Sequence, residues 1–208
     1  MSKIGVIDYG SGNFTSVWNS LSRLSDNLLR IKNGSDLINC SHIILPGVGA
    51  YNSAMDKLND LNITDGLLNE ILIKKKPFLG ICVGMQIMCE KGFEFKECKG
   101  LELIKGYVDE FEKKNDLILP HMGWNEIEDY ENQMLFKDID KEDPTFYFVH
   151  SYHLYTDDPS IKCTYTNYGY NFISAVEKEN IFGVQFHPEK SQFNGLTVLK
   201  NFIEITCD

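Results

Sequence analysis

The chain has 208 residues, of which 43% are hydrophobic and 24% are charged, the proportions of an ordinary globular protein. They exclude collagen, coiled coils and disorder, and a chain of this length can fold around one core, so we expect a single domain over 1–208. Its 20 Lys and Arg against 30 Asp and Glu give a net charge of −10, which argues against nucleic acid as a partner.

Cysteine spacing and hydropathy exclude further classes of protein. The six cysteines contain no C-x-x-C pair, which argues against a zinc ribbon or a disulfide framework and favours free thiols in a reducing compartment. The first apolar run stops at Asp8, too short for a secretory signal, and no run approaches the roughly 18 residues of a membrane span. We therefore expect a cytoplasmic protein that does not enter a membrane.

The first third of the chain alternates short β-branched runs with longer amphipathic segments. This pattern indicates βαβ units around a largely parallel sheet. Polar, glycine-rich turns follow the first and third strands, at 8–13 and 46–49, where glycine allows the backbone a close approach. The expected strands are 4–7, 28–31, 42–45 and 77–81, and the expected helices are 14–24 and 55–75, the second interrupted at 62–66.

Beyond Gly92 the pattern changes to short strands separated by turns. No long helix is expected before Lys190, so this half should be largely antiparallel and should extend or flank the parallel sheet. We therefore expect an α/β fold, with a mostly parallel sheet flanked by helices and an antiparallel extension. The expected strands are 107–111, 124–127, 146–149, 162–166 and 172–176, with a turn at 131–136 and a closing helix at 195–205.

The segment Gly80-Ile81-Cys82-Val83-Gly84 carries the strongest chemical signal. A nucleophile with glycines two residues before and after it, between an apolar strand and a helix, is the nucleophile-elbow pattern with Cys in place of Ser. The glycines admit a tight, strained turn, and a helix N-terminus favours the thiolate. The alternative is a buried structural cysteine in a strand-to-helix turn. Cys89, expected further along the same helix, has no such flanks and is interpreted as core.

A thiolate nucleophile needs a base and a group that orients the base. The expected strand 182–186 ends at His187-Pro188-Glu189, where the proline stiffens the turn and lets an imidazole and a carboxylate face one cleft. On its own this tripeptide is more often an ordinary turn. Beside a cysteine elbow on a parallel sheet, we interpret His187 and Glu189 as the other two members of a catalytic triad.

The other four histidines compete for the role of base. His42 begins an expected strand and is interpreted as structural. His121 and His150 lie beside polar residues and could line a cleft, but neither is followed by a carboxylate in a rigid turn. His150 and His153 have the wrong spacing for a metal site, so we expect no metal ligands here.

These motifs resemble those of the class I, triad-type glutamine amidotransferases. Further segments are similar to the glutaminase subunits of imidazole glycerol phosphate synthases, and the matches spread over nearly the whole chain. The resemblance implies a flavodoxin-like fold, a glutaminase that forms a cysteinyl thioester, and no cofactor. The segments are 8–13, 46–49, 120–125, 148–152 and 183–191.

Residues outside the triad acquire expected roles from this chemistry and from the resemblance. The oxyanion needs donors, for which the natural pair is the Val83 N–H with an N–H of the 47–49 loop. The resemblance implies that ammonia passes to a HisF-type (β/α)8 cyclase in a heterodimer. The expected sets are Gly47, Val48, Gly49 and Val83 for the oxyanion hole, Gln86, His150, Ser151 and Tyr152 for glutamine, and Asn13, Met122, Trp124 and Lys190 for the partner.

Departures from the family pattern leave the pathway open. Ser11, Phe14 and Thr15 differ from the usual first loop, and similar variants occur in paralogues thought to supply ammonia for amidino sugars of surface polysaccharides. A non-catalytic regulator of the same fold and a cysteine protease or deglycase are the alternatives of other classes. The residues themselves also allow a core aromatic at Trp124 and a solvated surface lysine at Lys190.

Overall fold

The computed structural model describes residues 3–112 and 117–206. Within them, eleven strands form one mixed sheet in the order β2-β1-β3-β4-β13-β12-β10-β7-β5-β6, with β11 paired to β12 beside this path. Two further strands, β8 and β9, pair with each other. Within the same described residues, no helix combines the length and the apolar character needed to cross a bilayer.

The parallel half of the sheet is built from five strands, four within residues 4–82 and one at residues 181–184. They are β2 (Leu28–Ile31), β1 (Ile4–Ile7), β3 (His42–Gly47), β4 (Phe78–Cys82) and β13 (Ile181–Val184), each parallel to its neighbour in this order. Apart from β2 at the edge, these strands are buried along their whole length, as apolar strands covered on both faces should be.

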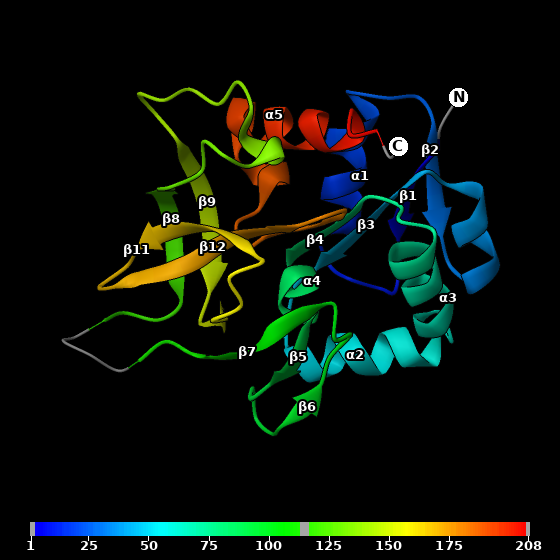
Figure 1. Ribbon diagram of the computed structural model, residues 1–208, viewed down its shortest axis with the longest axis horizontal. Coiled ribbons are helices and arrows are strands. Elements are labelled where there is room, and N and C mark those ends of the chain that lie inside the picture. Colours follow the sequence, from blue (N-terminus) through cyan, green and yellow to red (C-terminus); the bar gives the residue numbers. More distant parts are fainter. Residues whose placement is uncertain (1–2, 113–116, 207–208) are drawn as a thin grey trace.

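Helices cover both faces of this parallel layer. Helices α1 and α5 lie on one face, and α2 and α3 lie on the other (Figure 1). The short helix α4 follows β4 directly. Their bounds are α1 Phe14–Ser22, α2 Tyr51–Asp60, α3 Thr64–Leu68, α4 Val83–Gln86 and α5 Gln192–Ile203.

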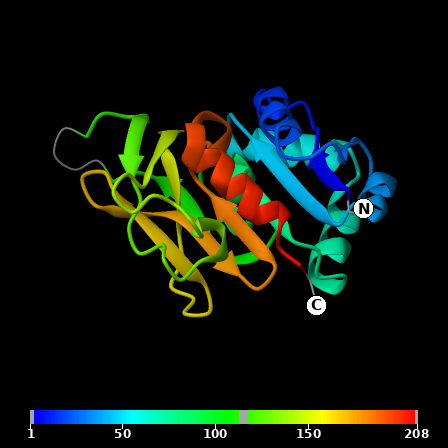
Figure 2. The ribbon, with the colours of Figure 1, turned by 90° about the horizontal axis from the view of Figure 1, so that it is seen from above.

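The antiparallel half extends to one side of the parallel layer (Figure 2). It joins the parallel half through β12, which pairs antiparallel with β13. Here the chain has few helices and its apolar side chains merge with the same hydrophobic core. The strands are β5 Cys89–Gly92, β6 Cys98–Lys99, β7 Ile104–Glu110, β8 His121–Glu126, β9 Thr145–His150, β10 Tyr152–Tyr155, β11 Lys162–Asn167 and β12 Asn171–Lys178.

The expected α/β fold with an antiparallel extension is confirmed, but two local predictions about the chain after β4 are wrong. The interrupted helix expected over 55–75 is present as α2, which begins earlier, at Tyr51, and as a second helical stretch over 64–73; the left-handed φ of 49° at Asn62 makes the break. Helix α4 has four residues, so Cys89 does not lie on it and instead begins β5, although it is buried as expected. Strands β5, β6 and β10 were not expected.

The two glycines beside Cys82 are required by close contacts. A Cβ on Gly84 would lie 1.9 Å from the carbonyl oxygen of Leu45 on β3, and one on Gly80 would lie 2.5 Å from the carbonyl oxygen of Gly84. Neither backbone can give way without moving a central strand. The glycines therefore allow the chain to turn sharply after β4 while remaining packed against β3.

Candidate active site

Cys82 occupies a strained backbone conformation at the end of β4. Its φ of 54° and ψ of −111° lie in a region that side-chain-bearing residues rarely adopt, and the helix α4 begins at the next residue. Its side chain borders a cavity that opens to the surface. A nucleophile at a strained strand-to-helix turn, flanked by glycines that cannot be replaced, has the geometry of a nucleophile elbow.

His187 and Glu189 lie beside Cys82 because β13 is the parallel neighbour of β4. Val184 pairs with Ile81, so the chain leaves both strands at the same edge of the sheet. The Nδ1–H of His187 donates a hydrogen bond to Oε1 of Glu189 at 2.8 Å, and both side chains are fully buried. This bond fixes the ring and leaves Nε2 as the atom that can exchange a proton with Cys82.

The charges of its neighbours keep His187 protonated. Burial would lower the pKa of His187, but a negative charge on Cys82 and the hydrogen bond and charge of Glu189 together raise this pKa to about 10. An imidazolium at His187 would therefore be stabilised by a negative charge on Cys82 and by the Glu189 carboxylate. This is the ground state expected of a cysteine nucleophile activated by a histidine.

The cavity beside Cys82 has a volume of about 470 Å³. Val48 and Gly49 line it opposite the Cys82-Val83 turn, as expected of the oxyanion loop. Gly47 does not line it: this residue is the last of β3, and a Cβ there would lie 2.6 Å from the hydroxyl of Tyr9. Gly47 therefore serves packing, and the donor expected from this loop is the Val48 or Gly49 N–H.

The residues expected to bind glutamine line the same cavity and are linked by hydrogen bonds. The amide nitrogen of Gln86 donates to the carbonyl of Tyr152 at 2.9 Å and to Oε1 of Gln185 at 3.0 Å. The amide of Gln185 in turn lies 3.7 Å from the Cys82 sulfur. Gln185 was not predicted; the sequence signal was a polar residue inside an otherwise apolar strand, next to the H-P-E turn.

His150, which lines the cavity, forms a neutral pair with His121. His150 Nδ1 donates to the carbonyl of Tyr152 at 2.9 Å, so its Nε2 accepts from Nδ1 of His121, 3.1 Å away. Burial lowers the pKa of His150 far below its ordinary value and that of His121 to about 4. They are poor bases, and they hold the Ser151-Tyr152 segment, which also lines the cavity.

The other two histidines also have structural contacts. His42 lies 2.8 Å from the hydroxyl of Ser41 and 2.9 Å from the carbonyl of Ile205, as expected for a structural residue. His153 lies 2.9 Å from the hydroxyl of Tyr170, and burial lowers its pKa to about 4. Over the described ranges, no group of three or more His, Cys, Asp or Glu is arranged to hold a metal ion.

Glu94 is a second residue of the cavity that the sequence did not reveal. Its Oε2 accepts the backbone N–H of Tyr51 at 2.8 Å, at the start of α2. Burial raises the pKa of Glu94, and the N–H of Tyr51 partly offsets this. The residue lines the cavity that also contains Cys82. It places a carboxylate in the same cavity as the nucleophile, where a cationic group of a substrate could bind.

Three of the four residues expected at a partner interface lie on the surface beside the triad. Met122 and Trp124, on β8, are 62% and 49% exposed. The exposed Lys190 places its Nζ 5.5 Å from the ring centre of Tyr147, and that ring meets Trp124 edge-on at 6.1 Å. We call Met122, Trp124, Tyr147 and Lys190 the rim patch. The exposure of Trp124 does not fit a core aromatic.

Asn13 does not fit the expected partner interface. Its side chain is 4% exposed, and its amide nitrogen donates to Oε1 of Glu189 at 3.1 Å. A side chain buried inside the chain has no surface to offer a partner. Asn13 therefore belongs with the triad; it was assigned to the interface because the family resemblance places the partner around the mouth of the active site.

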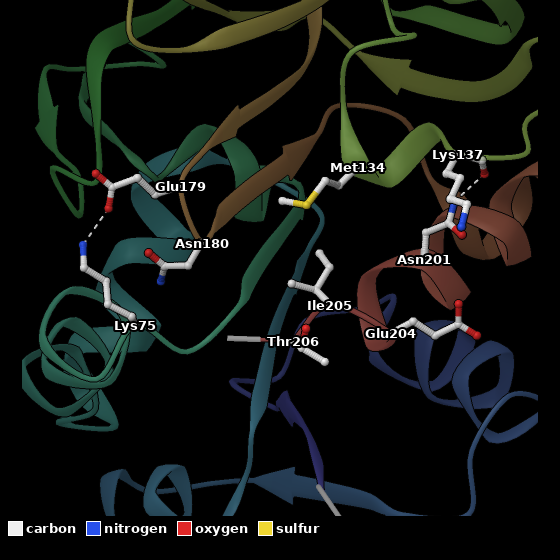
Figure 3. Close-up of a pocket in the computed structure, with 9 residues that line it drawn as sticks. All are labelled: Lys75, Met134, Lys137, Glu179, Asn180, Asn201, Glu204, Ile205 and Thr206. Atoms are coloured by element: carbon white, nitrogen blue, oxygen red, sulfur yellow. Dashed lines mark hydrogen bonds and ion pairs between the residues drawn. The ribbon is translucent and has the colours of Figure 1, made fainter. Parts of the chain in front are cut away.

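A larger cavity, of about 550 Å³, lies at the opposite end of the sheet (Figure 3). Lys75 and Asn180, which line it, precede β4 and β13, whereas Cys82 ends β4 and His187 follows β13. The strands themselves separate the two cavities. The larger one contains none of the triad and takes no part in the chemistry described above.

Comparison with known proteins identifies the family. The family model "Glutamine amidotransferase class-I" matches residues 6–205. The chain is 44% identical to the imidazole glycerol phosphate synthase subunit HisH of Methanocaldococcus jannaschii over 202 residues, covering 97% of this chain and 99% of that one. It is 41% identical to subunit HisH 1 of Campylobacter jejuni strain RM1221, covering 97% and 100%.

Solved structures agree on the fold. A crystal structure of a glutamine amidotransferase superposes with a TM-score of 0.74 at 15% identity, covering 97% of both chains. A chain from the structure of PurLQS from Thermotoga maritima superposes with a TM-score of 0.73 at 18% identity, covering 98% of each. The two relatives named above are HisH subunits of imidazole glycerol phosphate synthase, and the chain is an enzyme of the class-I glutamine amidotransferase family.

Proposed function

We propose that this chain is the cytoplasmic glutaminase subunit of an imidazole glycerol phosphate synthase, which hydrolyses glutamine and passes ammonia to a HisF-type (β/α)8 cyclase. The cyclase would use this ammonia to form imidazole glycerol phosphate and AICAR in histidine biosynthesis. The observation that carries the proposal is the strained Cys82 beside the His187–Glu189 pair, at one cavity. The HisH relatives support the choice of pathway.

The first half of the reaction uses the imidazolium. The Cys82 thiolate attacks the side-chain amide carbon of glutamine, and a tetrahedral intermediate forms. His187 then gives its Nε2 proton to the leaving nitrogen, so that ammonia departs and a thioester remains. Glu189 keeps the ring oriented and stabilises its charge before the proton moves.

The second half uses the same imidazole as a base. Neutral His187 takes a proton from water, which attacks the thioester and releases glutamate, and the imidazolium–thiolate pair is restored. In both halves the oxyanion needs donors, which we assign to the Val83 N–H and an N–H of the Val48-Gly49 segment. One such donor contributes about 10²–10³ in rate.

Substrate recognition follows from the charges of the cavity wall. Glutamine carries an α-ammonium and an α-carboxylate in addition to its amide. We assign the ammonium to the Glu94 carboxylate, and the remaining polar groups to Gln86 and the Ser151-Tyr152 segment. The neutral state of His150 suits this role, because it holds the segment without adding a charge.

We expect Glu94→Gln to weaken glutamine binding while sparing the chemistry. The amide keeps an acceptor for the Tyr51 N–H but loses the charge, so KM for glutamine should rise about 10- to 100-fold, as for loss of a charged hydrogen bond. Steady-state glutaminase kinetics measure this. Glu97→Gln, which changes an exposed ion pair with Lys91, is the matched control. An unchanged KM in Glu94→Gln would contradict the assignment.

The rim patch is assigned to the cyclase. It combines exposed apolar and aromatic side chains with one lysine, and it adjoins Glu189 through Lys190. Tryptophan at the centre of such a surface is a frequent binding hot spot. Ammonia released next to this surface would enter the partner rather than bulk water, where it would be protonated.

We expect Trp124→Ala to weaken the complex without changing the triad. Loss of a hot-spot tryptophan should raise the Kd for the cyclase about 30-fold. Titration calorimetry measures the Kd, and the rate of Cys82 alkylation in the free chain reports on the triad. Ile73→Ala, at an equally apolar exposed site near the amino end of β4, is the control. Equal Kd values for both variants would argue against the rim patch.

The proposed function is tested by glutamate release from the pure chain, alone and with increasing amounts of a HisF-type cyclase. We expect slow hydrolysis alone and faster hydrolysis with the cyclase. A regulator would release no glutamate in either case, and a protease or deglycase would act on other substrates. A cyclase that neither binds nor accelerates would favour the paralogue that serves polysaccharide synthesis.

A further inference from the structure

Asn13 does not make the helix-capping hydrogen bond that is usual for an asparagine at its position. It immediately precedes α1, where an asparagine side chain commonly accepts a backbone N–H and caps the helix. Here the side chain makes no capping bond. Its amide nitrogen instead donates to Oε1 of Glu189, 176 residues away in the sequence.

Ser11 fixes the orientation of the Asn13 amide. The Ser11 hydroxyl donates to Oδ1 of Asn13 at 2.6 Å, and both side chains are buried. An amide turned the other way would place its oxygen against the Glu189 carboxylate and leave two acceptors facing each other. The hydroxyl therefore holds the amide nitrogen toward Glu189.

The turn that carries this pair is itself held in place. Asp8, at its start, accepts the Gly10 N–H at 3.2 Å and forms an ion pair with Arg30 of β2. At its end, the carbonyl of Asn13 accepts the N–H of Val17 in α1 at 3.1 Å. A side chain on a turn anchored at both ends can hold a neighbour in position.

The Glu189 carboxylate would be free to rotate without a second hydrogen bond. Its Oε1 accepts both the His187 Nδ1–H and the Asn13 amide, whereas its Oε2, also buried, has no hydrogen-bond partner among the described residues. Without Asn13 the carboxylate would be held by a single bond and could rotate between its two oxygens. Rotation would turn the imidazole away from the direction of proton transfer.

We infer that Ser11 and Asn13 form a clamp that positions Glu189, and through it His187, for proton transfer. The inference rests on the proposed glutaminase reaction. Both are positioning residues, because neither lines the cavity beside Cys82. Ser11 acts only through Asn13, so the effects of removing the two should not add.

The test is a double-mutant cycle on glutaminase activity in the complex with the cyclase. We expect Asn13→Ala to lower kcat about tenfold with KM unchanged, and Ser11→Ala to lower it less. In the Asn13→Ala background, Ser11→Ala should have no further effect. Ser16→Ala, at an exposed position on α1, is the control and should keep the wild-type rate. Additive losses, a wild-type kcat in both single variants or a change confined to KM would overturn the clamp.

A second readout needs no activity. The proton on Nδ1 of His187, buried and bound to Glu189 at 2.8 Å, should give a downfield NMR resonance that His187→Gln removes. We expect it to broaden in Asn13→Ala and Ser11→Ala, and to persist in Ser16→Ala. A sharp, unshifted resonance in both clamp variants would overturn the inference. If the wild-type complex released no glutamate, the proposed function would fail, while this resonance would still decide the clamp.

Discussion

Replacing Cys82 with alanine should abolish glutaminase activity, with a loss of about 10⁴-fold or more in kcat. Cys82 has the strained conformation, the glycine flanks and the histidine partner, whereas Cys89 is buried in β5 and its pKa is raised by burial. Cys98→Ala, on the short strand β6, should keep full activity. A glutamine-analogue electrophile should label Cys82, as located by mass spectrometry, and labelling elsewhere with Cys82 untouched would reject the assignment.

The same variant should change the titration of His187. Burial lowers the pKa of His187, and the Cys82 charge is the strongest effect that opposes it. Without the thiolate, the imidazolium should therefore lose its proton at a lower pH than in the wild type. Titration of ¹⁵N-labelled histidine by NMR measures this, and an unchanged His187 titration would mean that the two side chains do not interact.

Replacing His187 should cost far more activity than neutralising Glu189. His187→Ala removes the acid of the first step and the base of the second, and should lower kcat about 10⁴-fold. In Glu189→Gln, an amide oxygen still accepts the Nδ1–H but the charge is lost, so we expect a smaller loss of about 10². Steady-state rates at saturating glutamine give both values.

Full activity in His187→Ala would mean that His121 or His150 acts as the base. The structure argues against this outcome, because both rings are bonded to each other or to Tyr152 and are neutral. His42→Ala, which removes contacts to Ser41 and Ile205, is a control for general loss of stability. Its kcat should remain near the wild-type value if the variant folds.

The parallel half of the fold was predictable because its strands are apolar throughout and its turns are rich in glycine. Every strand expected between Ile4 and Ile81 is present, though β3 extends to Gly47. The antiparallel half was harder. Strand β5 contains Glu90 and Lys91 and has only four residues, so its strand character comes from pairing with β7 and not from its own sequence.

The residues of the site also divide into those that a local sequence pattern predicts and those that only the packed fold brings together. The elbow and the H-P-E turn are local patterns, and parallel pairing of β4 with β13 brings them to one edge of the sheet. No local pattern indicates the contacts of Glu94, Gln185 and Asn13, because these contacts, with Tyr51, Cys82 and Glu189, join distant parts of the chain. Such contacts depend on the packed fold, and sequence spacing does not reveal them.

The contact between Gly84 and β3 limits how a partner could accelerate this enzyme. Gly47 pairs with Cys82 in the sheet, and Gly84 packs on the Leu45 carbonyl, so β3 cannot slide relative to the nucleophile. At the far end of the loop, Glu94 holds the N–H of Tyr51. Between these two fixed points, Gly49 has a φ of 96° and open space beside its Cα. A partner could then activate the enzyme by rotating the peptide plane at Gly49 alone. The strand before it and the helix after it would stay in place.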